Sequence, residues 1–176
     1  MKLISAIVCT TAAMGTSLLL PTVASATDVH CTSERGSDIT VIDGRTGCRA
    51  ASDTHGRASS AGYDGIGYAN ATAGADAYGI GAAGGIGASE GMGGIPIAIG
   101  IGADALALTS IADTRQGDNG SRLVAVSIAF DGSRAGVETT NSAVVCLGTA
   151  AFAWNSATGA TCLATPFGRW QTPTSD

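Results

Sequence analysis

Several short stretches of the chain alternate apolar with small or polar residues and end at turn-forming pairs. Residues 38–42 and 123–130 alternate in this way, and residues 143–147 form a further apolar run. Period-two alternation with β-branched residues is typical of strands. Asp43-Gly44 and Asp131-Gly132, which follow the first two runs, are typical of turns. The pattern therefore predicts an all-β chain.

The segment 61–112 is rich in glycine and alanine, with larger apolar residues recurring between them. A unit of small, acidic, small and large apolar residues recurs every fourteen residues, at Ala75–Tyr78, Ser89–Met92 and Ala103–Leu106. A period of this size indicates a short unit that coils repeatedly, as in a solenoid. We expect the large residue of each unit to fill a narrow interior in which small residues let backbones approach closely.

The cysteines have a related spacing. Cys146 and Cys162 each begin a Cys-Leu-x-Thr pattern sixteen residues apart, and Cys31 and Cys48 are seventeen apart. The fifth cysteine, Cys9, lies in the signal peptide expected at residues 1–26, and the four that remain in a small exported chain indicate two disulfides, for which three connectivities are open. Stacked strands lie about 4.8 Å apart, which suits a disulfide between equivalent positions of successive coils. The spacing favours Cys31–Cys48 and Cys146–Cys162, and the alternative is a hairpin that places Cys162 opposite Phe152.

The first 26 residues have the features of a signal peptide. Lys2 precedes an apolar stretch that ends at the cleavage motif Ala24-Ser25-Ala26. We therefore expect cleavage near Ala26 and a secreted, extracellular or cell-envelope location. No later stretch is apolar and long enough to predict a membrane span in the mature chain. The expected organisation is a signal peptide at 1–26, an N-terminal cap at 27–60, solenoid repeats at 61–112, and a C-terminal β region and cap at 113–176.

Together these patterns predict an all-β fold, a short Gly/Ala-rich parallel β-solenoid (β-roll) with disulfide-stapled ends. A small antiparallel β domain with a flexible Gly/Ala insertion is the alternative, because the composition of residues 61–112 also suits a linker. The formal net charge of −5 disfavours nucleic acid as a partner.

Four acidic residues follow the fourteen-residue spacing. They are Asp76, Glu90, Asp104 and Asp118. Stacked carboxylates repel one another, and a hard cation such as calcium would relieve that repulsion. The other interpretation is that these acids mark solvated turns. They are weak candidates for a metal site, and no other cofactor is expected.

Two motifs resemble enzyme signatures. Gly79–Gly84 matches the dinucleotide-binding glycine pattern, but the glycines that follow predict no helix. Gly87–Gly91 matches the hydrolase elbow around Ser89, but both histidines, His30 and His55, precede it. Trp154 and Trp170 are expected in the core. We therefore expect a non-enzymatic exported structural or interaction protein, with a secreted hydrolase or a calcium-dependent β-roll module as alternatives.

Residues 74–81 and 100–108 resemble the head repeats of trimeric autotransporter adhesins. This resemblance implies a parallel β-roll and, by analogy, a homo-oligomer. The layout of signal peptide, Gly/Ala-rich centre and Cys-Leu-x-Thr tail is similar to a family of uncharacterised small exported actinobacterial proteins. That second resemblance implies no activity and leaves the partner unknown.

Overall fold

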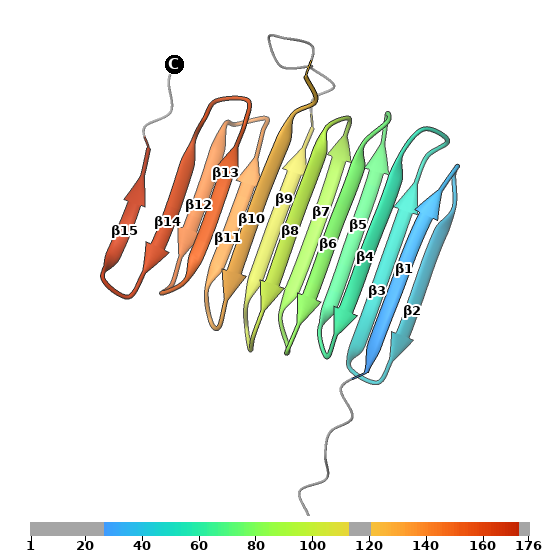
Figure 1. Cartoon of the computed structure of the whole chain (residues 1–176), viewed down its shortest axis with the longest axis horizontal. Helices are drawn as coiled ribbons and strands as arrows, with labels where there is room; N and C mark the ends of the chain where they lie inside the picture. The colour runs from blue at the N-terminus through green and yellow to red at the C-terminus, as the bar shows by residue number, and fades with distance from the viewer. Residues whose placement is uncertain (1–26, 113–120, 173–176) are drawn as a thin grey trace, which may run out of the picture.

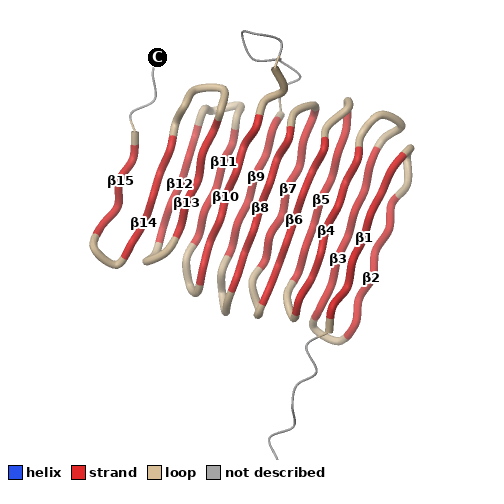
Figure 2. Tube along the Cα trace, viewed as in Figure 1, coloured by secondary structure: helices blue, strands red, loops and turns tan. Residues whose placement is uncertain are grey.

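The computed structural model describes residues 27–112 and 121–172, which form two β-sheets that run the length of the molecule (Figure 1). Sheet A contains, in spatial order, β1 (Asp28–Glu34), β4 (Arg57–Tyr63), β6 (Asp76–Ala82), β8 (Ile95–Ile101), β10 (Val124–Phe130), β13 (Ala151–Asn155), β14 (Thr161–Thr165) and β15 (Gly168–Gln171). Sheet B contains β12 (Ala143–Leu147), β11 (Arg134–Glu138), β9 (Leu106–Ile111), β7 (Ile86–Met92), β5 (Ile66–Thr72), β3 (Thr46–Ser52) and β2 (Asp38–Asp43). These ranges contain no helix, as Figure 2 shows.

The chain crosses from one sheet to the other after every strand from β3 to β10, and neighbouring strands among β3 to β11 within each sheet are parallel. This arrangement is a flattened parallel β-solenoid, which confirms the predicted fold. The antiparallel alternative with a flexible insertion is wrong, because the Gly/Ala-rich segment itself forms the parallel strands. Antiparallel strands close both ends, through β1 and β2 at one end and β12 to β15 at the other.

The length of a coil corrects the expected fourteen-residue period. Arg57 pairs with Asp76 and Ile66 pairs with Ile86, so one coil takes 19 or 20 residues. The last coil, which includes the segment 113–120, takes 28 or 29 residues. Each coil consists of two strands, most of them seven residues long, and two short turns. The three units that repeat at fourteen residues therefore fall on different parts of the coil. The apparent fourteen-residue repeat arose because the segment consists largely of glycine and alanine, and such a segment aligns with itself at many offsets.

Small residues fill the space between the sheets. Inward positions are occupied mainly by alanine, glycine, serine and cysteine, and the outward positions alternate with them. A Cβ added to Gly79 of β6 would lie 1.9 Å from the carbonyl oxygen of Tyr68 in the opposite sheet. The sheets are thus too close for large side chains. Tyr78 and Met92 are accordingly 43% and 48% exposed, so the expectation that such residues fill the interior was wrong.

The narrow space between the sheets also explains why the two tryptophans face outward. Trp170 is 54% exposed and Trp154 is half-buried on an outward position of β13, whereas both were expected in the core. The side chain of a tryptophan needs far more room than the interior offers. The two residues therefore contribute to the outer surface of sheet A.

Two disulfides join the sheets near the ends of the solenoid. The pairs are Cys31–Cys48 and Cys146–Cys162, as predicted, with Cα–Cα distances of 5.7 and 5.8 Å. The reason for the pairing differs from the expected one. Each bridge crosses the interior from sheet A to sheet B instead of linking equivalent positions on successive coils.

The C-terminal region combines features of both earlier interpretations. β13 and β14 form an antiparallel hairpin, in which Ala153 lies opposite Cys162 and Phe152 lies opposite Leu163. The hairpin alternative had placed Phe152 opposite Cys162, one residue away. Cys162 faces the interior and reaches its partner on β12 in sheet B. The expected signal peptide at 1–26 and the polar segment 113–120 lie outside the described residues.

Candidate functional site: a groove on sheet B

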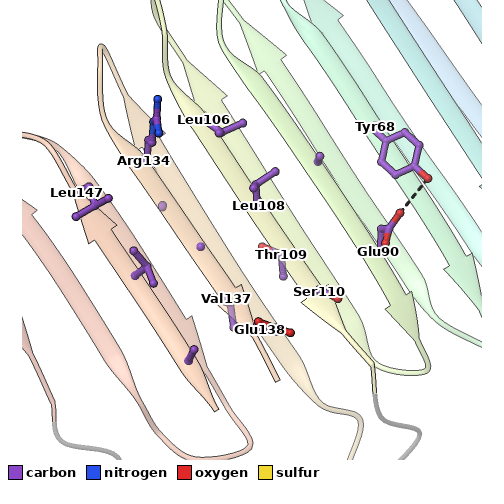
Figure 3. Close-up of a pocket in the computed structure, with 15 residues that line it drawn as sticks. Tyr68, Glu90, Leu106, Leu108, Thr109, Ser110, Arg134, Val137, Glu138 and Leu147 are labelled. Carbon is purple, nitrogen blue, oxygen red and sulfur yellow. Dashed lines mark hydrogen bonds between the residues drawn. The ribbon is translucent and has the colours of Figure 1, made fainter. Parts of the chain in front are cut away.

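A shallow groove of about 630 Å³ runs across the outer face of sheet B from β5 to β12 (Figure 3). It arises because outward residues of different size lie next to one another across the strands. The strand register places them in one row, in the order Tyr68, Ala88, Leu108, Gly136 and Val145. The small residues Ala88 and Gly136 leave depressions between the larger neighbours. The sheet backbone therefore sets the shape of the groove.

Polar and charged groups lie on either side of this apolar row. On one side, Arg134 lies between Leu106 and Leu147 in the register. On the other side, Ser110 lies between Glu90 and Glu138. Arg134 and Glu138 are the first and last residues of β11 and face the same side. Their Cα atoms are four residues apart along the strand, which is about 13 Å at the usual rise of about 3.3 Å per residue. The groove thus has a positive side, an apolar floor and a negative side.

Hydrogen bonds hold the aromatic end of the groove. The hydroxyl of Tyr68 donates to Oε1 of Glu90 at 3.1 Å (Figure 3). Burial, together with the hydrogen bond and charge of Glu90, raises the pKa of Tyr68 above its ordinary value. The guanidinium of Arg49 lies 5.9 Å from the centre of the Tyr68 ring. Tyr68 is therefore a neutral hydroxyl donor in a fixed position at neutral pH.

Arg49 is itself held by an acidic partner on the neighbouring edge strand. Its Nε and Nη2 donate to the two carboxylate oxygens of Asp38 at 3.1 and 2.7 Å. The hydrogen bond from Arg49 lowers the pKa of Asp38. A two-pronged contact of this kind fixes the plane of the guanidinium. The chain of contacts from Asp38 to Glu90 orders this end of sheet B.

The acidic residues spaced at fourteen do not form a column. Asp76 is on β6 of sheet A and Glu90 is on β7 of sheet B, while Asp104 lies in the turn between β8 and β9. Asp118 lies outside the described residues. The coil length of 19 or 20 residues separates them. Among residues 27–112 and 121–172, no group of three histidine, cysteine or acidic side chains is placed to hold a metal ion.

Asp76 has a structural partner instead. It forms an ion pair with Arg122, whose Nη2 also donates to the carbonyl oxygens of Gly74 and Gly94 at 2.7 and 2.9 Å. These two carbonyls lie at the starts of successive strands of sheet A. Arg122 therefore ties two successive coils together at the turns that precede β6 and β8.

The two enzyme-like motifs are parts of the β-solenoid. The Gly79–Gly84 segment continues β6 into a turn, and the strand β7 follows instead of a helix. Ser89 is fully buried between the sheets, while His30 is on the outer face of β1. Ser89 therefore has no access to solvent and does not lie on a strand-to-helix elbow.

Glu90 is the only candidate site residue predicted from the sequence that lines the groove, and Leu106, which was expected in the interior, lines it as well. Leu108, Arg134 and Val145 were missed because they are ordinary residues one by one and come together only through the register. The sequence pattern that could have located them is the alternation in residues 106–110 and 134–138, where inward residues alternate with outward Leu, Arg and Glu. The described ranges also contain no helix with the length and hydropathy needed to cross a bilayer.

Comparison with known proteins gives a family but no function. No curated protein and no solved structure matches the chain. A family model described as a family of unknown function, DUF6764, matches residues 1–165, which is most of the chain. The chain therefore belongs to this family of unknown function.

Proposed function

We propose that the protein is an exported, non-enzymatic interaction protein that binds an extended ligand in the groove of sheet B. The observation that carries this proposal is the groove itself, with an apolar floor between Arg134 on one side and Glu90 and Glu138 on the other. Concave, mostly apolar surfaces with a few placed polar groups are typical of ligand sites. The two disulfides support an oxidising, extracellular compartment, in agreement with the signal-peptide features of residues 1–26.

The charge arrangement supports one class of ligand, a short extended peptide with apolar side chains and free termini. A peptide of four residues in a strand conformation spans about 13 Å, which matches the separation of Arg134 and Glu138, so the peptide would lie along β11 and cross the apolar row at Gly136. The guanidinium of Arg134 suits a terminal carboxylate, and Glu138 suits a terminal ammonium group. Leu108 and Val145 would contact the side chains between them.

The experiment is calorimetric titration of the disulfide-bonded protein with tetrapeptides of leucine and valine that have free termini. Acetylated and amidated versions of the same peptides test the role of the end charges. We expect the free peptides to bind at least tenfold more tightly than the capped ones. Arg134→Gln should remove the preference for a free carboxylate, and Glu138→Gln should remove the preference for a free amine.

Arg45→Gln is the matched control, because Arg45 is exposed in the turn between β2 and β3 and does not line the groove. This variant should bind like the parent protein. Equal binding of free and capped peptides, or no binding of any of them, would contradict the assignment of the groove.

The alternative interpretations gain no comparable support. The hydrolase interpretation needs an accessible Ser89, whereas this residue is buried between the sheets. The calcium interpretation needed a column of acids, and the coil length separates its members. We accordingly propose that the protein acts without a cofactor.

A further inference from the structure

The outer face of sheet A carries a continuous apolar surface. Its central row crosses six strands, through Ile80, Ile99, Ile128, Phe152, Leu163 and Trp170. A parallel row contains Tyr78, Ile97, Val126 and Trp154. The rows continue from β6 to β15, which Figure 1 shows side by side along the molecule. We call the outward face of these six strands the apolar face.

This distribution is the reverse of an ordinary small domain. The interior holds alanine, glycine and serine, and the outer face of sheet A holds isoleucine, valine, phenylalanine and tryptophan. The outward positions of β8, β10, β13 and β14 include no charged side chain. Charges on the outward side of this sheet gather instead near its other end, on β1, β4 and the first residue of β6.

The size of the apolar face suits a protein interface. Six strands about 4.8 Å apart, with four to seven residues each at about 3.3 Å per residue, give a projected area of about 550 Å². The accessible area of a surface with projecting side chains exceeds its projection. The accessible area of the apolar face therefore approaches the roughly 600–800 Å² that each partner buries in a stable complex. Few monomers expose a continuous apolar surface of this size.

We propose that a second copy of this chain covers the apolar face, so that two solenoids pack sheet A against sheet A about a two-fold axis. Flat sheets pack face to face about 10 Å apart, with side chains interdigitating. Isoleucine and valine hold few rotamers and lose little freedom on packing. A two-fold contact uses the same surface twice and needs no complementary surface elsewhere.

Charge favours a second copy over a bilayer. The chain has a formal net charge of −5, and the apolar face carries no basic residue on β8, β10, β13 or β14 to meet anionic lipid headgroups. The arrangement goes beyond the proposed peptide binding, because it leaves the groove of sheet B open on both outer sides of the dimer.

The test is sedimentation velocity of the disulfide-bonded protein as recovered from expressing cells. Protein concentrations of about 1 to 100 μM are used, because this range detects a dimer whose dissociation constant is micromolar or lower. The variant Ile99→Thr/Ile128→Thr changes two central residues of the apolar face but keeps β-branched side chains. The control Ile66→Thr/Ile86→Thr makes the same change on outward residues of sheet B. We expect a dimer for the parent and the control, and at least tenfold weaker association for the first variant.

If that double variant does not fold, as judged by circular dichroism, the nearly isosteric Val126→Thr takes its place and should weaken association several-fold. A parent protein that stays monomeric at 100 μM overturns the proposal, as does equal dissociation of the apolar-face variant and the sheet B control. Flotation of a monomeric parent with phosphatidylcholine vesicles assigns the face to lipid and overturns it as well. Peptide binding to the groove should survive in the apolar-face variant, so the two proposals fail separately.

Discussion

Oδ2 of Asp53 accepts a hydrogen bond from the backbone N–H of Ala73 at 2.7 Å, although the two residues lie 20 positions apart in the chain. The other carboxylate oxygen accepts from the backbone N–H groups of His55 and Gly56 at 2.9 and 2.7 Å. One side chain thus accepts hydrogen bonds from backbone N–H groups in the turn before β4 and in the equivalent turn one coil later.

The stability of the protein should fall in acid partly through Asp53. Its three backbone donors, that of Ala73 first, lower the pKa of the carboxyl group below the ordinary value. A group whose pKa is lower in the folded state stabilises the fold above its unfolded pKa, and this contribution is lost as the pH falls through the folded pKa. Urea midpoints measured from pH 7 to pH 2 should therefore fall more steeply for the parent than for Asp53→Asn. Identical slopes for parent and Asp53→Asn would contradict this role.

Gly79→Ala should be strongly destabilising. The added Cβ would lie 1.9 Å from the carbonyl oxygen of Tyr68, so the two sheets must separate. We expect a loss of about 3 kcal/mol or more in the free energy of unfolding, the upper part of the range for overpacked interiors. Gly136→Ala is the control, because its Cβ meets its nearest neighbour at 3.9 Å. Denaturant unfolding monitored by circular dichroism measures both, and equal losses would show that the sheets are not this close.

Removal of either disulfide should lower the free energy of unfolding by about 3 kcal/mol, the value expected for a closed loop of this length. The separations are 17 residues for Cys31–Cys48 and 16 for Cys146–Cys162. Double serine variants at each pair, compared by chemical denaturation, give the two losses separately. A loss well below 1 kcal/mol at one end would indicate that the antiparallel strands there close the solenoid without the bridge.

Arg122→Gln should weaken the contact between the successive coils that contain β6 and β8. The change removes the ion pair with Asp76 and two hydrogen bonds to carbonyl oxygens on successive coils. Because the pair is partly exposed, we expect a loss of about 1 to 2 kcal/mol in the free energy of unfolding. Arg45→Gln removes a longer and more exposed contact with Asp64 and should be nearly neutral. Thermal melts of the two variants would contradict this ranking if Arg45→Gln were the more damaging.

Much of the architecture could be predicted from the sequence, since alternation and turn pairs mark the strands. Residues 143–147 were predicted as a strand and form β12, and residues 123–130 nearly coincide with β10. Both disulfide pairs were also correct. The period was wrong because Gly/Ala-rich segments match themselves at many offsets, and only hydrogen-bond register decides between fourteen and 19 or 20 residues.

The direction of the large side chains was the second error. Tyr78, Met92 and Trp170 were assigned to the interior because large apolar residues are usually buried. Whether they fit depends on the distance between the sheets, which is set by residues such as Gly79 and Gly67 on facing strands. That distance is a property of the packed pair of sheets, so the groove and the apolar face could not be located before the fold was known.

The very narrow gap between the two sheets has a consequence for sequence variation. Every second residue of a strand is limited to a few atoms, whereas its neighbours on either side face outward and meet no such limit. In a saturation mutagenesis scan of β5 to β8, positions that tolerate substitution should therefore alternate with positions that do not. The outward residues of both sheets can therefore change without altering the framework that holds the sheets together.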